Sequence, residues 1–295
     1  MQANESGDVE RAGQLAAEMT RVAPESFEAW FEAGLHAKAR RDWPRCAKWN
    51  ERAMELFGQH QVDEYGGVNP AAWNLGIAAT AIGDWALARR AWTTFGVTGM
   101  AAESNSPIDM DLGQVPIRLN PDRPSLTLQS VPEYGETEVV WCWRRSPAHA
   151  VIASVPLPES GHRFRDVVLH DGEPKGTRRN GESEVPVFDQ LERLEESGLP
   201  TWQLQVEGAT DEDLASLADL AGPRGLGLDD WSGIKVMCST CSHGSADPDH
   251  VHPPAKPGSR TLGLAGDEPA LAQVLDQWVQ ASPSRPRLLE FDLIW

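Results

Sequence analysis

The sequence has few cysteines and no long apolar run. Four cysteines in 295 residues are too few for the disulfide framework of a small secreted domain. The opening MQANESGDVERAG lacks the basic and apolar regions of a secretory signal, and no stretch offers the ~18 consecutive apolar residues of a membrane span. We therefore expect a cytoplasmic protein that has no membrane partner.

Motifs of several enzyme classes are also missing. The chain contains no glycine-rich phosphate loop, no G-x-S-x-G turn around a nucleophilic serine and no H-E-x-x-H zinc helix. Enzymes without these motifs exist, but no pattern in the sequence argues for one. We therefore expect a protein that is not an enzyme.

Positive charge is scarce and unevenly distributed. The net charge is −18, with 10 basic and 13 acidic side chains in residues 1–100 but 16 and 31 in residues 101–295. A field of this sign repels nucleic acid and speeds the encounter with a basic protein. We expect no nucleic-acid partner and a basic protein partner, although an acidic surface can also serve solubility alone.

The N-terminal third has helical periodicity and an internal repeat. EAWFEAGLHAKARRDWPRCAKWNERAMELF aligns with AAWNLGIAATAIGDWALARRAWTTFGV at an offset of 42 residues, with Gly34 matching Gly76. Small residues at such positions let two antiparallel helices approach closely. The copies differ where Asn50 stands in the first and Trp92 in the second. AGQLAAEMTRVAP, further upstream, has the pattern of the second helix of an incomplete copy.

These segments resemble the tetratricopeptide repeat, most clearly in NLGIAATAIGDWALARRAW, residues 74–92. The linker GQHQVDEYGGVNP makes the period longer than the 34 residues of that family. The resemblance implies a domain of helical hairpins over residues 1–100. Its tryptophans are predicted to be mainly core and interface, with a peptide groove as the alternative: Trp30, Trp43, Trp49, Trp73, Trp85 and Trp92.

Residues 101–295 are predicted to form an acidic α+β domain with a mixed sheet. After a Pro/Asn/Asp-rich connection over residues 103–125, the strand-like runs are TEVVWCWRR, HAVIASVPL and HRFRDVVLHDG. VPVFDQLERLEESG is predicted to be a helix between Pro186 and Gly198. Two strand–helix–strand units follow, the first with TWQLQVEG, TDEDLASLADLAG and GIKVMCS, the second with RTLGLAG, DEPALAQVLDQWVQA and RPRLLEFDLIW. Right-handed crossovers would place both helices on one face of their sheet.

The stretch CSTCSHGSADPDHVH, residues 238–252, is the candidate metal site. Cys238 and Cys241 follow a predicted strand, so both thiolates could face one ion, and His250 and His252 could complete a tetrahedral set. His243, Asp247 and Asp249 are substitute ligands, and free thiols or a redox pair are the alternatives. Four protein ligands leave no open position, so we expect a structural zinc ion.

SGHRFRDVVLHDG offers a second constellation. If it is one strand, alternation places His162, Asp166 and His170 on the same face, where they could act as acid/base groups or metal ligands. The competing interpretation is a strand whose polar residues pair with their neighbours.

VPLPESGHRFRDVVLHDGEPKGTRR, VPVFDQLERL and CSTCSHG, downstream of repeat helices, resemble a group of bacterial proteins found near polymorphic toxin systems. The resemblance implies an immunity protein that binds and neutralises a cognate toxin. Two alternatives remain. One is a metal-dependent enzyme that uses the His162 strand or the Cys238 cluster, and the other is a general tetratricopeptide-repeat adaptor.

Overall fold

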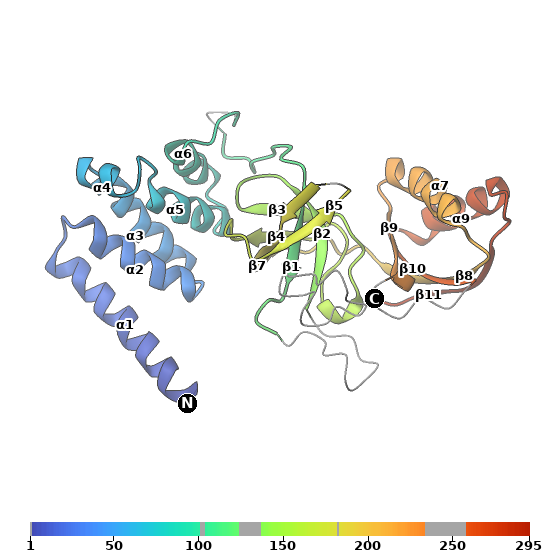
Figure 1. Ribbon diagram of the computed structural model, residues 1–295, viewed down its shortest axis with the longest axis horizontal. Coiled ribbons are helices and arrows are strands. Elements are labelled where there is room, and N and C mark those ends of the chain that lie inside the picture. The colour runs from blue at the N-terminus through green and yellow to red at the C-terminus, as the bar shows by residue number, and fades with distance from the viewer. Residues whose placement is uncertain (1, 101–103, 124–136, 182, 234–257) are drawn as a thin grey trace. The chain divides into compact units, whose positions relative to one another are not determined.

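The computed structural model describes residues 2–100, 104–123, 137–181, 183–233 and 258–295, with side chains from residue 10 onward. The chain divides into two compact units (Figure 1). Unit 1 holds residues 1–112 together with Arg145–His149, and unit 2 holds Gly113–Arg144 and Ala150–Trp295. The chain is of the α+β class, because helices α1–α6 precede a part built on sheets.

Unit 1 is a stack of antiparallel helices compatible with a helical repeat. The helices are α1 (Gln2–Val22), α2 (Phe27–Ala39), α3 (Trp43–Leu56), α4 (Gln59–Glu64), α5 (Pro70–Ala81) and α6 (Trp85–Phe95). Each packs on the next major helix, α1 on α2, α2 on α3, α3 on α5 and α5 on α6. The two aligned copies thus form the hairpins α2–α3 and α5–α6. The short α4 lies in what the sequence suggests is only a linker.

The two hairpins turn in the same way. Asp42 caps α3 by accepting a hydrogen bond from the backbone N–H of Arg45, and Asp84 caps α6 by accepting one from Leu87. An aspartate at this position satisfies a backbone donor that the first turn of a helix leaves unpaired. The repeated Asp-Trp dipeptide is therefore the start signal of the second helix in each hairpin.

Close helix packing explains the two matched glycines. A Cβ atom on Gly34 would lie 2.3 Å from Asn50 Nδ2, and one on Gly76 would lie 2.5 Å from the indole of Trp92. Asn50 and Trp92, which stand at the same position of the two copies, are therefore the residues that pack against the matched glycines. Trp43 and Trp92 are buried, as predicted, whereas the other four tryptophans of unit 1 are half-buried: Trp30, Trp49, Trp73 and Trp85.

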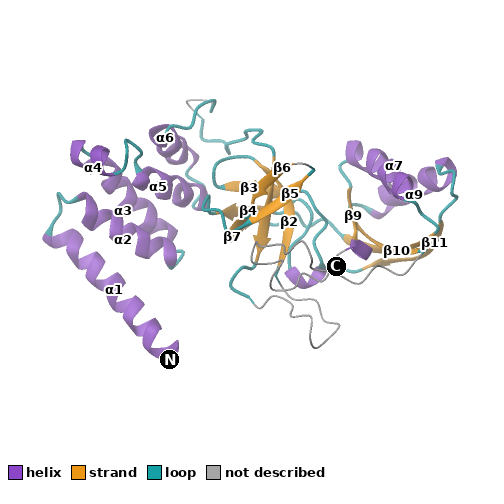
Figure 2. Cartoon of the chain, viewed as in Figure 1, coloured by secondary structure: helices purple, strands orange, loops and turns teal. Residues whose placement is uncertain are grey.

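Unit 2 begins with a closed barrel of strand order β1-β2-β3-β4-β7 (Figure 2). Its strands are β1 (Gln114–Leu119), β2 (Glu138–Arg144), β3 (His149–Ile152), β4 (Val167–His170) and β7 (Phe188–Glu195). β1 runs parallel to β7 and antiparallel to β2, so the sheet is mixed, as predicted. A separate hairpin pairs β5 (Thr177–Asn180) with β6 (Ser183–Pro186). The buried barrel core consists of Val115, Ile117, Leu119, Val140, Cys142, Ala150, Ile152, Val168 and Phe188.

Three predictions for this region are wrong. VPVFDQLERLEESG is the strand β7 rather than a helix, because it pairs with both β1 and β4 to close the barrel. Phe188 and Gln190 are the buried residues of β7. Because Gln190 is polar, the sequence lacks the alternation of apolar and polar residues that identifies a strand. β1 lies inside the stretch interpreted as a connection, where Val115, Ile117 and Leu119 alternate with polar or proline residues.

The third wrong prediction is the long strand over 162–170. Only Val167–His170 forms a strand, and the residues before it turn, with Arg165 at a φ of 67°. A preceding 3-10 turn, η1 (Pro158–Ser160), ends at Gly161 in the left-handed conformation. His162 and Asp166 therefore lie on this turn and not on the face of a strand.

The C-terminal part of unit 2 contains two strand–helix–strand units, in which both helices and three of the four strands lie where they were predicted. The elements are β8 (Thr201–Glu207), α7 (Asp211–Ala221), η2 (Gly222–Arg224), β9 (Gly227–Asp230), η3 (Trp231–Gly233), β10 (Ser259–Ala265), α9 (Glu268–Ala281) and β11 (Arg287–Leu293). The sheet has the order β11-β8-β10-β9, and all its neighbouring strands are antiparallel. This is the βαββαβ topology, in which two split units share one sheet. We refer to it as the C-terminal sheet domain.

Both helices of the C-terminal sheet domain cover the same face of the sheet, as predicted (Figure 1). Strand residues Trp202, Leu204 and Leu262 pack there against helix residues such as Leu271 and Trp278. GIKVMCS, predicted as the strand of the first unit, begins at Gly233, the last residue of η3, and the rest of it lies outside the described residues, whereas the observed strand is β9. On the opposite face, β8 presents Gln203, whereas Trp231 covers the neighbouring Gly263 of β10.

Candidate functional site

The predicted zinc ligands Cys238, Cys241, His250 and His252 lie outside the described residues, as do the substitutes His243, Asp247 and Asp249. The segment that holds them connects β9 to β10. Both other cysteines, Cys46 and Cys142, are buried as free thiols, and burial raises the pKa of both, to about 12 for Cys46. Neither of these two thiols therefore has the thiolate character of a nucleophile or metal ligand at neutral pH.

His162 makes a hydrogen bond through each ring nitrogen. Its Nδ1 lies 2.9 Å from the carbonyl oxygen of Ser160, and its Nε2 lies 2.7 Å from the side-chain amide nitrogen of Gln190. Nδ1–H therefore donates and Nε2 accepts, which is the neutral tautomer. Burial also lowers the pKa of His162, which opposes protonation. To take up a proton, the ring must give up the bond from Gln190.

Asp166 holds the turn before β4. One carboxylate oxygen accepts the backbone N–H of Ser197 at 2.8 Å, and the other accepts that of Arg163 at 3.0 Å and lies 3.5 Å from Arg193 Nη1. These bonds satisfy a fully buried carboxylate and join the turn to the end of β7.

His170 packs as an aromatic ring. It stacks on Phe188 with centroids 5.3 Å apart, and its Nδ1 lies 3.1 Å from the carbonyl oxygen of Asp171. His162, Asp166 and His170 do not bring one ligand atom each within 4.8 Å of the other two, which is the spacing of a metal-binding group. The bonds that each of them makes stabilise the barrel.

Sequence reasoning missed two buried carboxyl groups that bind the loop between β3 and β4. Glu138 accepts the backbone N–H of Leu157 at 3.0 Å, and burial raises its pKa to about 8. Asp229, on β9, accepts the backbone N–H of Val155, and burial raises its pKa to about 6. The two residues lie far apart in the sequence, so no local spacing could have revealed that they share a loop. Asp229 thereby joins this loop of the barrel to the C-terminal sheet domain.

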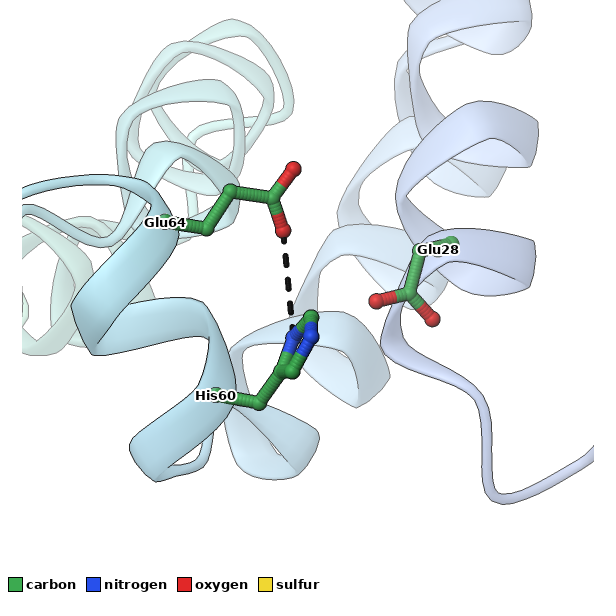
Figure 3. A group of neighbouring side chains, drawn as sticks. All are labelled: Glu28, His60 and Glu64. Carbon is green, nitrogen blue, oxygen red and sulfur yellow. Dashed lines mark ion pairs between the residues drawn. The ribbon is translucent and has the colours of Figure 1, made fainter.

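Another cluster lies on unit 1, where Glu28, His60 and Glu64 each offer one ligand atom within 4.8 Å of the others (Figure 3). Among the described residues it is the only such group of three His, Cys, Asp or Glu side chains. His60 Nδ1 lies 3.9 Å from Glu64 Oε2, one helical turn away on α4. Glu28 comes from α2 and accepts hydrogen bonds from Ser26 Oγ at 2.7 Å and Gln61 Nε2 at 2.9 Å.

These bonds orient Glu28 toward α4, and the hydrogen bond from the Ser26 hydroxyl lowers the pKa of its carboxyl group. The donor set of one imidazole and two carboxylates suits a divalent cation. All three side chains are exposed, so water competes at every ligand position and nothing buried fixes the geometry. We therefore assign the cluster no part in the function.

The C-terminal sheet domain has a strongly one-sided surface charge. Over residues 201–230 and 258–295, the exposed basic residues are Arg224, Arg285 and Arg287. The exposed acidic residues are Glu207, Asp211, Glu212, Asp219, Asp267, Glu268, Asp276, Glu290 and Asp292. Arginines neutralise two of these carboxylates, since Arg287 pairs with Glu207 and Arg260 with Asp211. The remaining excess produces a negative field around this domain.

The acidic stretch at the start of α7 is only partly available to a partner. Asp213 is buried and forms a capping box with Thr210, in which each side chain bonds the backbone N–H of the other. Ser284 also donates to the Asp213 carboxylate at 2.6 Å. Asp213 is therefore a structural group, whereas its neighbour Glu212 is exposed.

Comparisons with known proteins identify no relative. No family model, no curated protein and no solved structure matches the chain. Within the described residues, no helix has both the length and the hydropathy needed to cross a membrane.

Proposed function

We propose that the chain is a non-enzymatic binding protein whose C-terminal sheet domain captures a basic protein partner. The observation that carries the proposal is the excess of exposed carboxylates over arginines on this domain. Charges of one sign spread over a surface attract a partner of the opposite sign and raise the rate of association. The histidines and the aspartate that could support catalysis are instead engaged in hydrogen bonds that hold the barrel together.

The helical hairpins of unit 1 support a binding role independently. Their matched glycines, aspartate caps and Asp-Trp turns fit a tetratricopeptide-like array, and such arrays offer extended surfaces to other proteins. A general adaptor would use this surface alone, whereas the acidic domain favours a partner of defined charge.

The finer form of the proposal is an immunity protein that neutralises a toxin. It rests on the sequence resemblance and on charge, since proteins that act on nucleic acid are commonly basic. Zinc bound by the Cys238 segment would then act only as a structural element of this binder.

The test is to co-purify the chain with the product of a neighbouring toxin-like gene and to measure both rate constants at low and high salt. The association rate should fall as salt rises, while dissociation changes little, because screening acts over about 8 Å at physiological ionic strength. An association rate that salt does not change, or an acidic partner, would refute the proposal.

A charge-reversal variant locates the effect. Replacing Glu212, Asp219 and Asp276 by lysine changes exposed positions of α7 and α9. The matched control reverses Glu10, Glu18 and Glu32 on unit 1, which gives the same change in net charge. We expect slower association for the first variant only.

A further inference from the structure

The strand β11 forms one edge of the C-terminal sheet. Its inner side pairs antiparallel with β8, from Arg287 opposite Glu207 to Leu293 opposite Trp202. Within the part of the chain that the structure describes, no strand pairs with its other side. An edge of this kind presents backbone N–H and C=O groups that can bond an additional strand.

The hydrogen bonds of β11 indicate which groups face outward. The N–H of Ile294 donates to the carbonyl of Thr201, the residue of β8 that precedes Trp202, at 2.9 Å. Since alternate residues of a strand bond to the same neighbour, Asp292 and Glu290 also face β8. The N–H and C=O groups of Phe291 and Leu293 therefore point to the open edge.

A bulge limits the usable length of this edge. The pairing register shifts between Leu288 and Glu290, so the regular part begins at Glu290. Bulges, lysines and prolines are the usual devices that block edge pairing. The segment Glu290–Leu293 contains no bulge, lysine or proline. Its two charged side chains, Glu290 and Asp292, oppose an acidic strand and attract a basic one.

The side chains along the edge define the partner's chemistry. Glu290 and Asp292 are exposed and lie on the sheet face opposite the helices, because Phe291 between them packs on the helix side. Leu289 and Leu293 are 46% and 58% exposed. A strand added here meets carboxylates on one face and apolar side chains at its margins.

We propose that the edge at Glu290–Leu293 receives an extended basic segment of a protein partner as an additional antiparallel strand. The inference rests on the proposed function and names the surface that performs it. Alternating basic and apolar residues suit the segment, since directly opposite side chains lie on the same face of a sheet.

A second copy of this chain is a poorer occupant. Antiparallel self-pairing centred on Asp292 would set the two Asp292 carboxylates opposite each other. Self-pairing centred on Phe291 would set Glu290 opposite Asp292. Like charges directly opposite each other destabilise a strand pair.

The probe is the peptide Lys-Val-Lys-Val-Lys-Val, acetylated and amidated at its ends, titrated into the full-length protein. Valine amides of an added strand bond Phe291 and Leu293, and lysine amides point away. A peptide N-methylated at its valines should therefore bind at least about tenfold more weakly, whereas one N-methylated at its lysines should bind like the parent. Amide chemical shifts should change around Leu289–Ile294, and the Leu293 amide should exchange with solvent more slowly in the complex.

Leu293→Pro is the matched variant of the protein. Its N–H faces the open edge, so proline removes a donor to the peptide without breaking a bond to β8. We expect the fold to persist and the affinity for the parent peptide to fall at least about tenfold, as it does for the valine-methylated peptide. If the variant does not fold, the two N-methylated peptides still decide the question on the wild-type protein.

The outcomes separate the two proposals. Equal binding of both N-methylated peptides, or shift changes confined to α7 and α9, overturns docking at the β11 edge while leaving capture of a basic partner intact. If neither this peptide nor any basic partner binds in a salt-dependent manner, both proposals fail. Shift changes at the edge together with sensitivity to valine methylation support both.

Discussion

Gly76 lies directly against the indole ring of Trp92, so that a Cβ atom on Gly76 would come within 2.5 Å of the ring. Neither partner has room to yield, because both are fully or almost fully buried between α5 and α6. The glycine is thus a packing requirement at this contact and not a source of backbone flexibility.

Gly76→Ala should therefore lower the free energy of unfolding of unit 1 by about 1–3 kcal/mol, as overpacking does. The direction is informative because alanine has the higher helix propensity and would otherwise stabilise the helix. Gly13→Ala is the control, since it lies within α1 and the nearest atom to its added Cβ is 3.8 Å away. Chemical denaturation of the full chain measures both, and equal stability of the two variants would contradict the packing model.

Thr210→Ala should destabilise the C-terminal sheet domain by about 1 kcal/mol, the usual cost of losing a helix N-cap. The cause is that Thr210 Oγ1 accepts the Asp213 N–H at the start of α7. Glu212→Ala removes a neighbouring exposed side chain and should have little effect on the melting temperature. The prediction fails if Glu212→Ala costs as much as Thr210→Ala.

The stability of unit 2 should depend on the ionisation of Asp229. Burial raises its pKa from the ordinary 3.8 to about 6, so between these values the folded state keeps a proton that the unfolded state has lost. This contribution is fully present below the unfolded-state pKa and disappears as pH rises through the folded-state pKa, at about 1.4 kcal/mol for each pKa unit. Glu138 contributes to stability in the same direction, because burial raises its folded-state pKa to about 8.

Asp229→Asn tests this by keeping an oxygen acceptor for the Val155 N–H while removing the titration. The difference in unfolding free energy between wild type and variant should shift in favour of the wild type as pH falls from about 7 to about 4. Asp219→Asn, at an exposed position of α7, provides the control. A difference that stays constant across this range would show that Asp229 does not titrate there.

Zinc analysis should find about one ion per chain in protein purified without an affinity tag, held by Cys238 and Cys241. Cys238→Ser with Cys241→Ser should abolish the bound zinc and lower the melting temperature, because metal binding contributes to folding free energy. His60→Asn, which removes the imidazole of the exposed cluster on α4, should leave the zinc content unchanged. Wild-type protein without zinc rules the site out.

Local signals predicted the elements that depend on local chemistry. The aspartate caps of α3 and α6, and the box of Thr210 and Asp213, are satisfied within a few residues. Both helices of the C-terminal sheet domain were predictable for the same reason, since α7 has its capping box and α9 a proline in its first turn. β8 was predictable because it buries alternate residues, whereas the short β9 was not predicted.

The barrel was harder to predict because its strands are determined by distant partners. β7 carries Gln190 at an inward position, and that amide is satisfied by His162 from another part of the chain. β1 contains Pro116, which discourages a strand interpretation, although Pro116 lies outside the short register that β1 shares with β7. The carboxyls of Glu138 and Asp229 are likewise brought to one loop only by tertiary folding.

The different residues above the two matched glycines also bear on how the repeat assembles. Near-identical modules can dock in the wrong order or exchange between molecules during synthesis. Here Gly76 requires an indole and Gly34 accommodates an amide. If α3 occupied the position of α6, Asn50 would fill only part of the space that the Trp92 ring occupies. The reverse exchange would force that ring against Cys46, whose Sγ lies 3.4 Å from Asn50 Nδ2. The contact residue of each hairpin therefore fits only its own glycine, which favours a single order of stacking.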